Sequence, residues 1–257
     1  MTDGAGEIPA EQVSVATGRV APVAPVWHTI ILLVVIVGLS ALQGLPKLTQ
    51  GGEPLQPNRL VTYILTLIYE VVLLGYVWLI RVMKYKVPLR ELIGGRWKTA
   101  LDFLKDVGVA LLFWCAVLGL LLFASYELHF SGAAAAKGVL PRTVPELTTF
   151  LVLAVFAGFC EEVVFRGYLL RQFTAWTGSA WTSVVLQGVT FGLAHGYQGW
   201  KGMLVISVYG ALFGTLAVLW KSLRPGIMQH CGQDAFTGII GWVAFKRHIP
   251  LPMIMRF

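Results

Sequence analysis

Ionisable side chains are scarce in the apolar stretches of this chain, and those that occur there are suited to acid–base chemistry. Burying such a group in a bilayer costs free energy, so each one is a candidate functional residue. Besides Glu70, three groups occur, each in a separate apolar stretch: Glu161, Glu162 and Arg166; His195; and His230 with Asp234. Carboxylates and imidazoles are the side chains that most often move protons in enzymes.

The spacing within the first group predicts different roles for its two glutamates. Glu162 and Arg166 are four residues apart, so they share a helix face and are expected to form an internal ion pair. Glu161 is turned by about 100° from Glu162 and is expected to point into the helix bundle. A glutamate pair with one member neutralised and the other free is suited to general-base catalysis.

Simple arithmetic predicts that the three groups meet. At about 1.5 Å per residue, Glu161 lies ~20 Å, His195 ~22 Å and Asp234 ~14 Å from the same end of their spans. His230 and Asp234 are four residues apart and share a face. The sequence therefore predicts one buried zone where a carboxylate, an imidazole and a His–Asp pair converge.

The elements that carry these residues are predicted to be transmembrane helices. Of 257 residues, 56% are hydrophobic and 13% charged, and the mean hydropathy is +0.72. These values exclude a disordered chain, a coiled coil and an ordinary soluble enzyme. We predict an all-α multipass bundle of about seven spans, each long enough to cross a bilayer. They lie near residues 28–45, 60–82, 103–125, 148–173, 180–197, 202–220 and 226–245.

The spans are predicted to divide into two functional parts. Residues 1–26 are expected to be a flexible tail, 27–144 N-terminal spans, 145–246 the catalytic core and 247–257 a short tail. The basic segment 81–105 is interpreted as an interfacial amphipathic stretch. If the seven spans are drawn in order, 12 of the 20 Lys and Arg residues fall on the same side of the membrane as the N-terminus. The positive-inside rule then predicts a cell-membrane protein with its N-terminus in the cytoplasm.

Other features receive structural interpretations. The net charge of +7 forms no aromatic-interleaved patch, so no nucleic-acid partner is predicted. The pairs Gly188–Gly192 and Gly210–Gly214 are expected to let helices pack closely. Glu70, alone in its span, is expected to be a structural hydrogen-bonding partner.

The three groups together resemble a known family. Residues 161–167, Glu-Glu-Val-Val-Phe-Arg-Gly, match an E-E-x-x-x-R motif; residues 191–195 match F-x-x-x-H; and residues 230–234 match H-x-x-x-[N/D]. Their order on successive apolar helices is similar to that of the CPBP intramembrane proteases, also called the Abi or CAAX-protease-and-bacteriocin-processing family. The resemblance covers roughly residues 145–245, and the first three spans carry no motif.

The resemblance implies an endopeptidase that cleaves a membrane-anchored peptide or protein, such as a prenylated CAAX segment. It assigns activation of the attacking water to Glu161 and His195, and oxyanion stabilisation or metal binding to His230 and Asp234, with Glu162 and Arg166 in support. Asp234 stands where the prenyl proteases have Asn, and an ionised Asp cannot donate to an oxyanion. It would instead orient His230, bind a metal or be protonated. Both a glutamate-only mechanism and a divalent metal such as zinc, held by Glu161, His195, His230 and Asp234, stay open.

Two other functions compete with the protease hypothesis. Buried carboxylates and histidines also suit the proton relay of an ion-coupled transporter, although no inverted repeat is evident. A non-catalytic membrane scaffold, for example in immunity to bacteriocins, is the second. Such a scaffold would have no need for so many costly buried charges.

Overall fold

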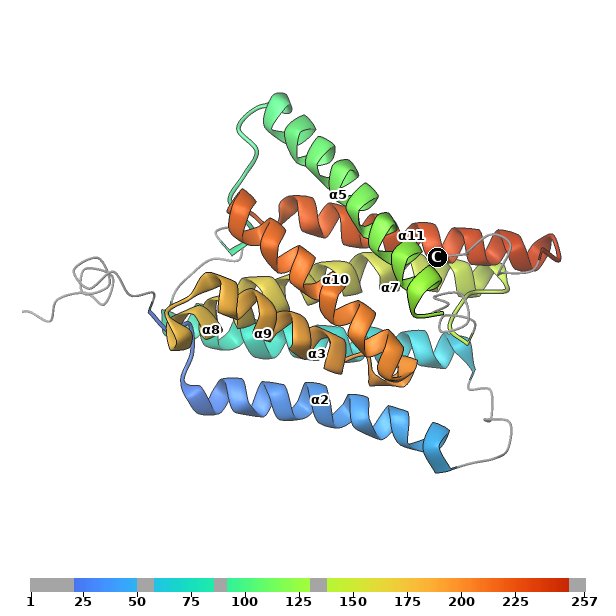
Figure 1. The fold of residues 1–257 in the computed structure, drawn as a ribbon, viewed down its shortest axis with the longest axis horizontal. Coiled ribbons are helices and arrows are strands. Elements are labelled where there is room, and N and C mark those ends of the chain that lie inside the picture. The colour runs from blue at the N-terminus through green and yellow to red at the C-terminus, as the bar shows by residue number, and fades with distance from the viewer. Residues whose placement is uncertain (1–20, 50–57, 86–91, 130–137, 250–257) are drawn as a thin grey trace, which may run out of the picture.

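The computed structural model describes residues 21–49, 58–85, 92–129 and 138–249, and every regular element within them is a helix (Figure 1). This confirms the all-α prediction. The elements are α2 (Val26–Thr49), α3 (Arg59–Tyr85), α5 (Ala100–Glu127), α7 (Val144–Glu161), η1 (Glu162–Leu169), α8 (Leu170–Thr177), α9 (Ala180–Leu193), η2 (Gly196–Gln198), α10 (Gly199–Trp220) and α11 (Arg224–Lys246).

Local sequence signals fix several helix starts. Thr99 caps α5 and Thr143 caps α7, each in a full capping box with Asp102 or Glu146 three residues later. In each box the threonine hydroxyl accepts a backbone N–H of the first turn, while the carboxylate accepts the N–H of the capping residue. The capped ends therefore need no partner from elsewhere in the protein.

The helices account for the seven predicted spans when α7, η1 and α8 are taken as one continuous element. Among the described residues, four segments are long and apolar enough to cross a membrane: Arg59–Ile80, Ala100–Glu127, Val144–Thr177 and Gly196–Trp220. Val26–Leu42 and Ala180–Leu193 are shorter apolar helices. The seventh helix, α11, has 23 residues and is more polar, because it carries His230 and Asp234.

The fourth span differs from the prediction of one regular helix over residues 148–173. Residues Glu162–Leu169 form a π-helix, and all eight are buried. A π-helix hydrogen-bonds from residue i to i+5, so its turns are wider than those of an α-helix, and such segments are rare and often found at functional sites. The E-E-x-x-x-R motif begins at the junction of α7 and this wider turn, which a periodicity analysis based on regular helices could not detect.

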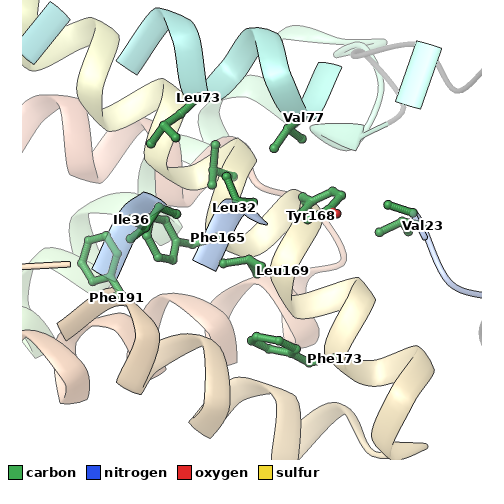
Figure 2. Packing of buried hydrophobic residues seen from close by; sticks show 12 residues of the cluster. Val23, Leu32, Ile36, Leu73, Val77, Phe165, Tyr168, Leu169, Phe173 and Phe191 are labelled. Atoms are coloured by element: carbon green, nitrogen blue, oxygen red, sulfur yellow. The ribbon is translucent and has the colours of Figure 1, made fainter. Parts of the chain in front are cut away.

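The largest hydrophobic cluster of the described residues surrounds the π-helix (Figure 2). Leu32 and Ile36 of α2 and Leu73 and Val77 of α3 pack there with residues of η1, and Phe191 of α9 completes the cluster on the side of the candidate site. The large apolar side chains on the outer faces of α2, α3 and α5 are exposed. This distribution is expected of a bundle whose outside faces lipid.

Close glycine contacts bring neighbouring helices together. An added Cβ at Gly188 would lie 2.8 Å from the backbone nitrogen of Ala211, and one at Gly210 would lie 3.0 Å from Cβ of Phe191. The packing role predicted for the glycine pairs of α9 and α10 is therefore confirmed. Gly158 provides a similar contact between α7 and α11, where an added Cβ would lie 2.8 Å from the nitrogen of Cys231.

One end of the bundle gathers the start of α2, the end of α3, the start of α5, and the α8–α9 and α10–α11 turns (Figure 1). Asp106 of α5 ties several of these together. Its carboxylate accepts from the indole nitrogens of Trp97 and Trp220, at 2.7 Å each, and pairs with Arg224 at 2.8 Å. The carbonyl of Ile93 accepts from the backbone N–H of Leu223 at 3.1 Å.

Two predicted segments are therefore more structured than expected. In the basic stretch 81–105, residues 81–85 belong to α3 and residues 86–91 lie outside the described part. Residues 100–105 begin α5, and between them the carbonyl of Ile93 is bonded to the α10–α11 turn. Of the predicted tail 1–26, residues 1–20 are outside the described part. Val23 and Ala24 are buried, and their backbone N–H groups donate to Oε1 of Gln172 at 2.8 and 3.1 Å. Tertiary hydrogen bonds therefore hold both places in the bundle.

Candidate active site

A cavity of about 1330 Å³ lies inside the bundle and contains side chains from all three motifs. Glu161 of α7, His195 after α9, and His230 and Asp234 of α11 all line it. The predicted convergence of these three helical segments is thus observed. The remaining lining is largely apolar and comes from α2, α3, α5 and α10 as well.

Glu162 does not line the cavity but joins two of the motifs behind it. Its Oε1 lies 2.9 Å from Nη1 of Arg166, as the spacing predicted, and 3.1 Å from Nδ1 of His230. Only 1% of the Glu162 side chain is exposed. A carboxylate only accepts hydrogen bonds, so Nδ1 of His230 carries the proton that is donated to Glu162. The sequence analysis missed this second contact, because 68 residues separate the two side chains.

The buried guanidinium of Arg166 contacts a carboxylate, a backbone carbonyl and two aromatic rings. Besides the Glu162 pair, its Nη2 donates to the carbonyl of Gly210 at 3.1 Å. Its guanidinium carbon lies 4.4 Å from the ring centroid of Phe191 and 4.8 Å from that of Phe213. Cation–π contacts of this kind are stronger when they are removed from water. These contacts offset part of the cost of burying the ion pair, and Nε of Arg166 has no hydrogen-bond partner among the described residues.

The second nitrogen of His230 faces the free carboxylates. Nε2 lies 3.5 Å from Oε2 of Glu161 and 3.9 Å from Oδ2 of Asp234. These separations exceed a good hydrogen bond, which leaves room for a small ligand or a water to bridge the groups. Glu161 is 18% exposed and Asp234 38%, against 5% for His230. The two glutamates thus have the separate environments predicted for them.

His195 lies in the turn between α9 and η2, just beyond the regular helix that was predicted to include it. Its Nδ1 is 2.8 Å from the carbonyl oxygen of Phe191, which can only accept, so Nδ1 is the protonated nitrogen of the neutral ring. Nε2 then carries the lone pair. This tautomer can accept a proton or a hydrogen bond in the cavity that His195 lines.

A helix without any motif holds this turn in place. Ser40 of α2 donates from Oγ to the carbonyl of Leu193 at 2.7 Å and accepts from the N–H of Gly196 at 2.8 Å. These two bonds bracket His195. In the sequence, the one sign of this role of Ser40 was a serine inside an apolar helix. Such a serine is usually interpreted as hydrogen-bonding to the backbone of its own helix.

Glu70 of α3 was expected to be a structural hydrogen-bonding partner, and within the described part of the chain its Oε2 does not act as one. The residue is 4% exposed, and its Oε2 is buried without a hydrogen-bond partner among the described residues. It lines the same cavity as Glu161.

The predicted metal ligands do not have the arrangement that a zinc ion requires. Structural and catalytic zinc sites use at least three protein ligands at about 2.0–2.3 Å from the ion. Within the ranges that the structure describes, no three His, Cys, Asp or Glu side chains form such a group. The chemistry below is derived from the protein groups alone.

Comparison with known protein families supports the resemblance seen in the motifs. Residues 143–236 match the family model named Rce1-like, which is described as type II CAAX prenyl endopeptidase Rce1-like. The matched segment contains all three motifs, and the family model is one of the CPBP group of proteases. No curated protein and no solved structure matched the chain.

Proposed function

Because residues 143–236 form an Rce1-like segment, we propose that the protein is an intramembrane endopeptidase that uses glutamate and histidine to activate water. The observation that carries the proposal is the meeting of Glu161, His195 and His230 on one cavity enclosed by apolar helices. Groups that move protons and groups that can stabilise negative charge are thereby placed around a space large enough for a peptide.

In the proposed reaction, Glu161 accepts a proton from a water that attacks the scissile carbonyl. The lone pair on Nε2 of His195 holds the same water in position. Partial exclusion of bulk water strengthens these contacts, since charges interact more strongly at low dielectric. General-base catalysis of this kind contributes about 10²–10⁴-fold to a rate.

His230 is proposed to act as an imidazolium, protonated on both nitrogens before the reaction, and to donate to the tetrahedral oxyanion from Nε2, the nitrogen that faces the cavity. Glu162 fixes the ring through Nδ1, and Arg166 in turn holds Glu162. Asp234, 3.9 Å from Nε2, favours positive charge on the ring as the oxyanion develops. The Asn-to-Asp difference from the prenyl proteases is thereby accommodated, because in this scheme Asp234 acts through His230 and does not itself donate.

The proposed substrate is a membrane-associated peptide near its lipid anchor, such as a prenylated CAAX segment. The name of the matching family supports this class, and so does the largely apolar lining of the cavity. A prenyl chain and the flanking side chains would be partitioned from the bilayer into such a space by the hydrophobic effect.

The test is hydrolysis of a farnesylated CAAX-type peptide by the purified protein in detergent micelles. Glu161→Gln should lower kcat by about 10²-fold or more, because the amide cannot accept the water proton. Glu127→Gln, the same change at an exposed position at the end of α5, should leave the rate unchanged. Circular dichroism and gel filtration check that both variants are folded.

A chelator arm of the same assay addresses the metal. A rate that is unchanged by 1,10-phenanthroline supports the protein-only mechanism, and a loss restored by added Zn²⁺ assigns the catalysis to a metal. The protease proposal itself fails if the folded wild-type protein cleaves neither this peptide nor a panel of unprenylated membrane peptides. It also fails if Glu161→Gln cleaves as fast as the wild type.

A further inference from the structure

A second carboxyl group lies in the cavity and has no part in the proposed mechanism. Glu70 is contributed by α3, outside the segment that matches the protease family, yet it lines the cavity together with Glu161. α3 packs along α7, so this position is set by a main contact of the bundle. Only 4% of the residue is exposed, and its Oε2 is unpartnered among the described residues.

The surroundings of Glu70 do not explain it as a structural residue. Glu161 and Asp234 are the charged groups that act on it most, and both are acidic. Within the described part of the chain, neither a cation nor a hydrogen-bond donor pairs with its Oε2. A buried carboxylate in such a place would be costly, and the acid form avoids most of that cost. A protonated Glu70 carboxyl group in this cavity is suited to donate a proton during a reaction and to be reprotonated afterwards.

The reaction proposed above needs such a group. When the tetrahedral intermediate collapses, the leaving nitrogen must receive a proton, because an amide anion is far too basic to depart. Enzymes that use two carboxyl groups in one cavity commonly divide the work, one acting as the base and the other as the acid.

We propose that Glu70 is the general acid that protonates the leaving nitrogen. This inference rests on the proposed protease function. Water loses a proton to Glu161 as its oxygen bonds to the scissile carbon. The oxyanion then re-forms the carbonyl, the C–N bond breaks, and the nitrogen takes the proton of the Glu70 carboxyl. A water between the two carboxyl groups returns the proton from Glu161 to Glu70, so the net change is one water consumed per peptide bond.

The experiment compares two substrates that differ in their leaving group. One is the farnesylated CAAX-type peptide, and the other is the same peptide with the scissile amide replaced by a thioester. A thiol has a pKa of about 8.5, so it leaves as a thiolate without help from an acid. Glu70→Gln should lower kcat for the amide by about 10²–10⁴-fold and for the thioester by less than about 10-fold. Glu127→Gln serves as the matched control.

The outcomes separate this inference from the proposed function. Equal losses on amide and thioester would make Glu70 a structural or binding residue and overturn its role as acid. Full amide turnover by Glu70→Gln would overturn it as well. In both cases the Glu161-dependent activity of the wild type would still support the protease. If the wild type cleaves neither substrate, the proposed function fails and this inference fails with it.

Discussion

At the scale of single residues, Glu162 connects the parts of the candidate site. It accepts from Arg166 and from His230, so one buried carboxylate joins the π-helix to α11. Removing one partner of a buried pair leaves an uncompensated charge, which typically costs about 3–5 kcal/mol. Arg166→Met should therefore lower the free energy of unfolding by about this amount, as measured by denaturant titration in mixed micelles.

A double variant separates charge from packing at this position. Glu162→Gln together with Arg166→Met removes both charges, so we expect it to be more stable than Arg166→Met alone. Its activity should stay low, because an amide in place of the carboxylate holds His230 less firmly. A double variant that is less stable than either single one would show that packing around these side chains, and not the pairing of their charges, controls stability here.

At the scale of elements, the approach of α7 to α11 sets the distance between Glu161 and His230. Gly158 makes this approach possible, since an added Cβ would lie 2.8 Å from the nitrogen of Cys231 and 2.9 Å from its Sγ. Gly158→Ala should push the helices apart and cost about 1–3 kcal/mol, as overpacked contacts do. A shift of about 1 Å at catalytic groups can reduce a rate 10²-fold, so activity should fall by more than stability alone explains.

Gly119→Ala on α5 is the matched control for this prediction. Its added Cβ would meet nothing within 4 Å, so stability and activity should be unchanged or slightly improved. Thermal unfolding and peptide cleavage, measured on both variants, test whether the distance between α7 and α11 controls activity. Wild-type activity in Gly158→Ala would show that the α7–α11 distance does not control the reaction.

At the scale of the whole molecule, the protein is a membrane-embedded helix bundle, and the positive-inside rule predicts which end of it faces the cytoplasm. The described parts of the basic 81–105 segment and the α8–α9 and α10–α11 turns lie at the end where α2 begins (Figure 1). By the positive-inside rule this end should face the cytoplasm. Lys98→Cys and Glu127→Cys place a thiol near the start and at the end of one span, α5.

A membrane-impermeant maleimide measures this orientation in a background with Cys115→Ser. In intact cells it should label Glu127→Cys and not Lys98→Cys, and in inverted membrane vesicles the pattern should reverse. The opposite pattern would place the N-terminus outside and contradict the predicted topology.

The sequence alone determined the features that depend on composition and on local spacing. Apolar stretches of sufficient length identified seven helical segments, because crossing a bilayer requires a satisfied backbone and a long apolar surface. Spacing of four residues predicted the Glu162–Arg166 pair, and helix lengths predicted that Glu161, His195 and His230 meet. Their catalytic roles stay predictions, which the variants above test.

The tertiary structure decided the contacts that depend on how helices rotate and pack against one another. Nothing in the local sequence indicated that Glu162 also binds His230 or that Ser40 brackets the turn of His195. Nor did it indicate that Oε2 of Glu70 lacks a hydrogen-bond partner among the described residues. The π-helix belongs to the same class, because it shifts the register of a helix without changing its apolar pattern. Such contacts join segments far apart in the chain, and only the packed bundle fixes which faces meet.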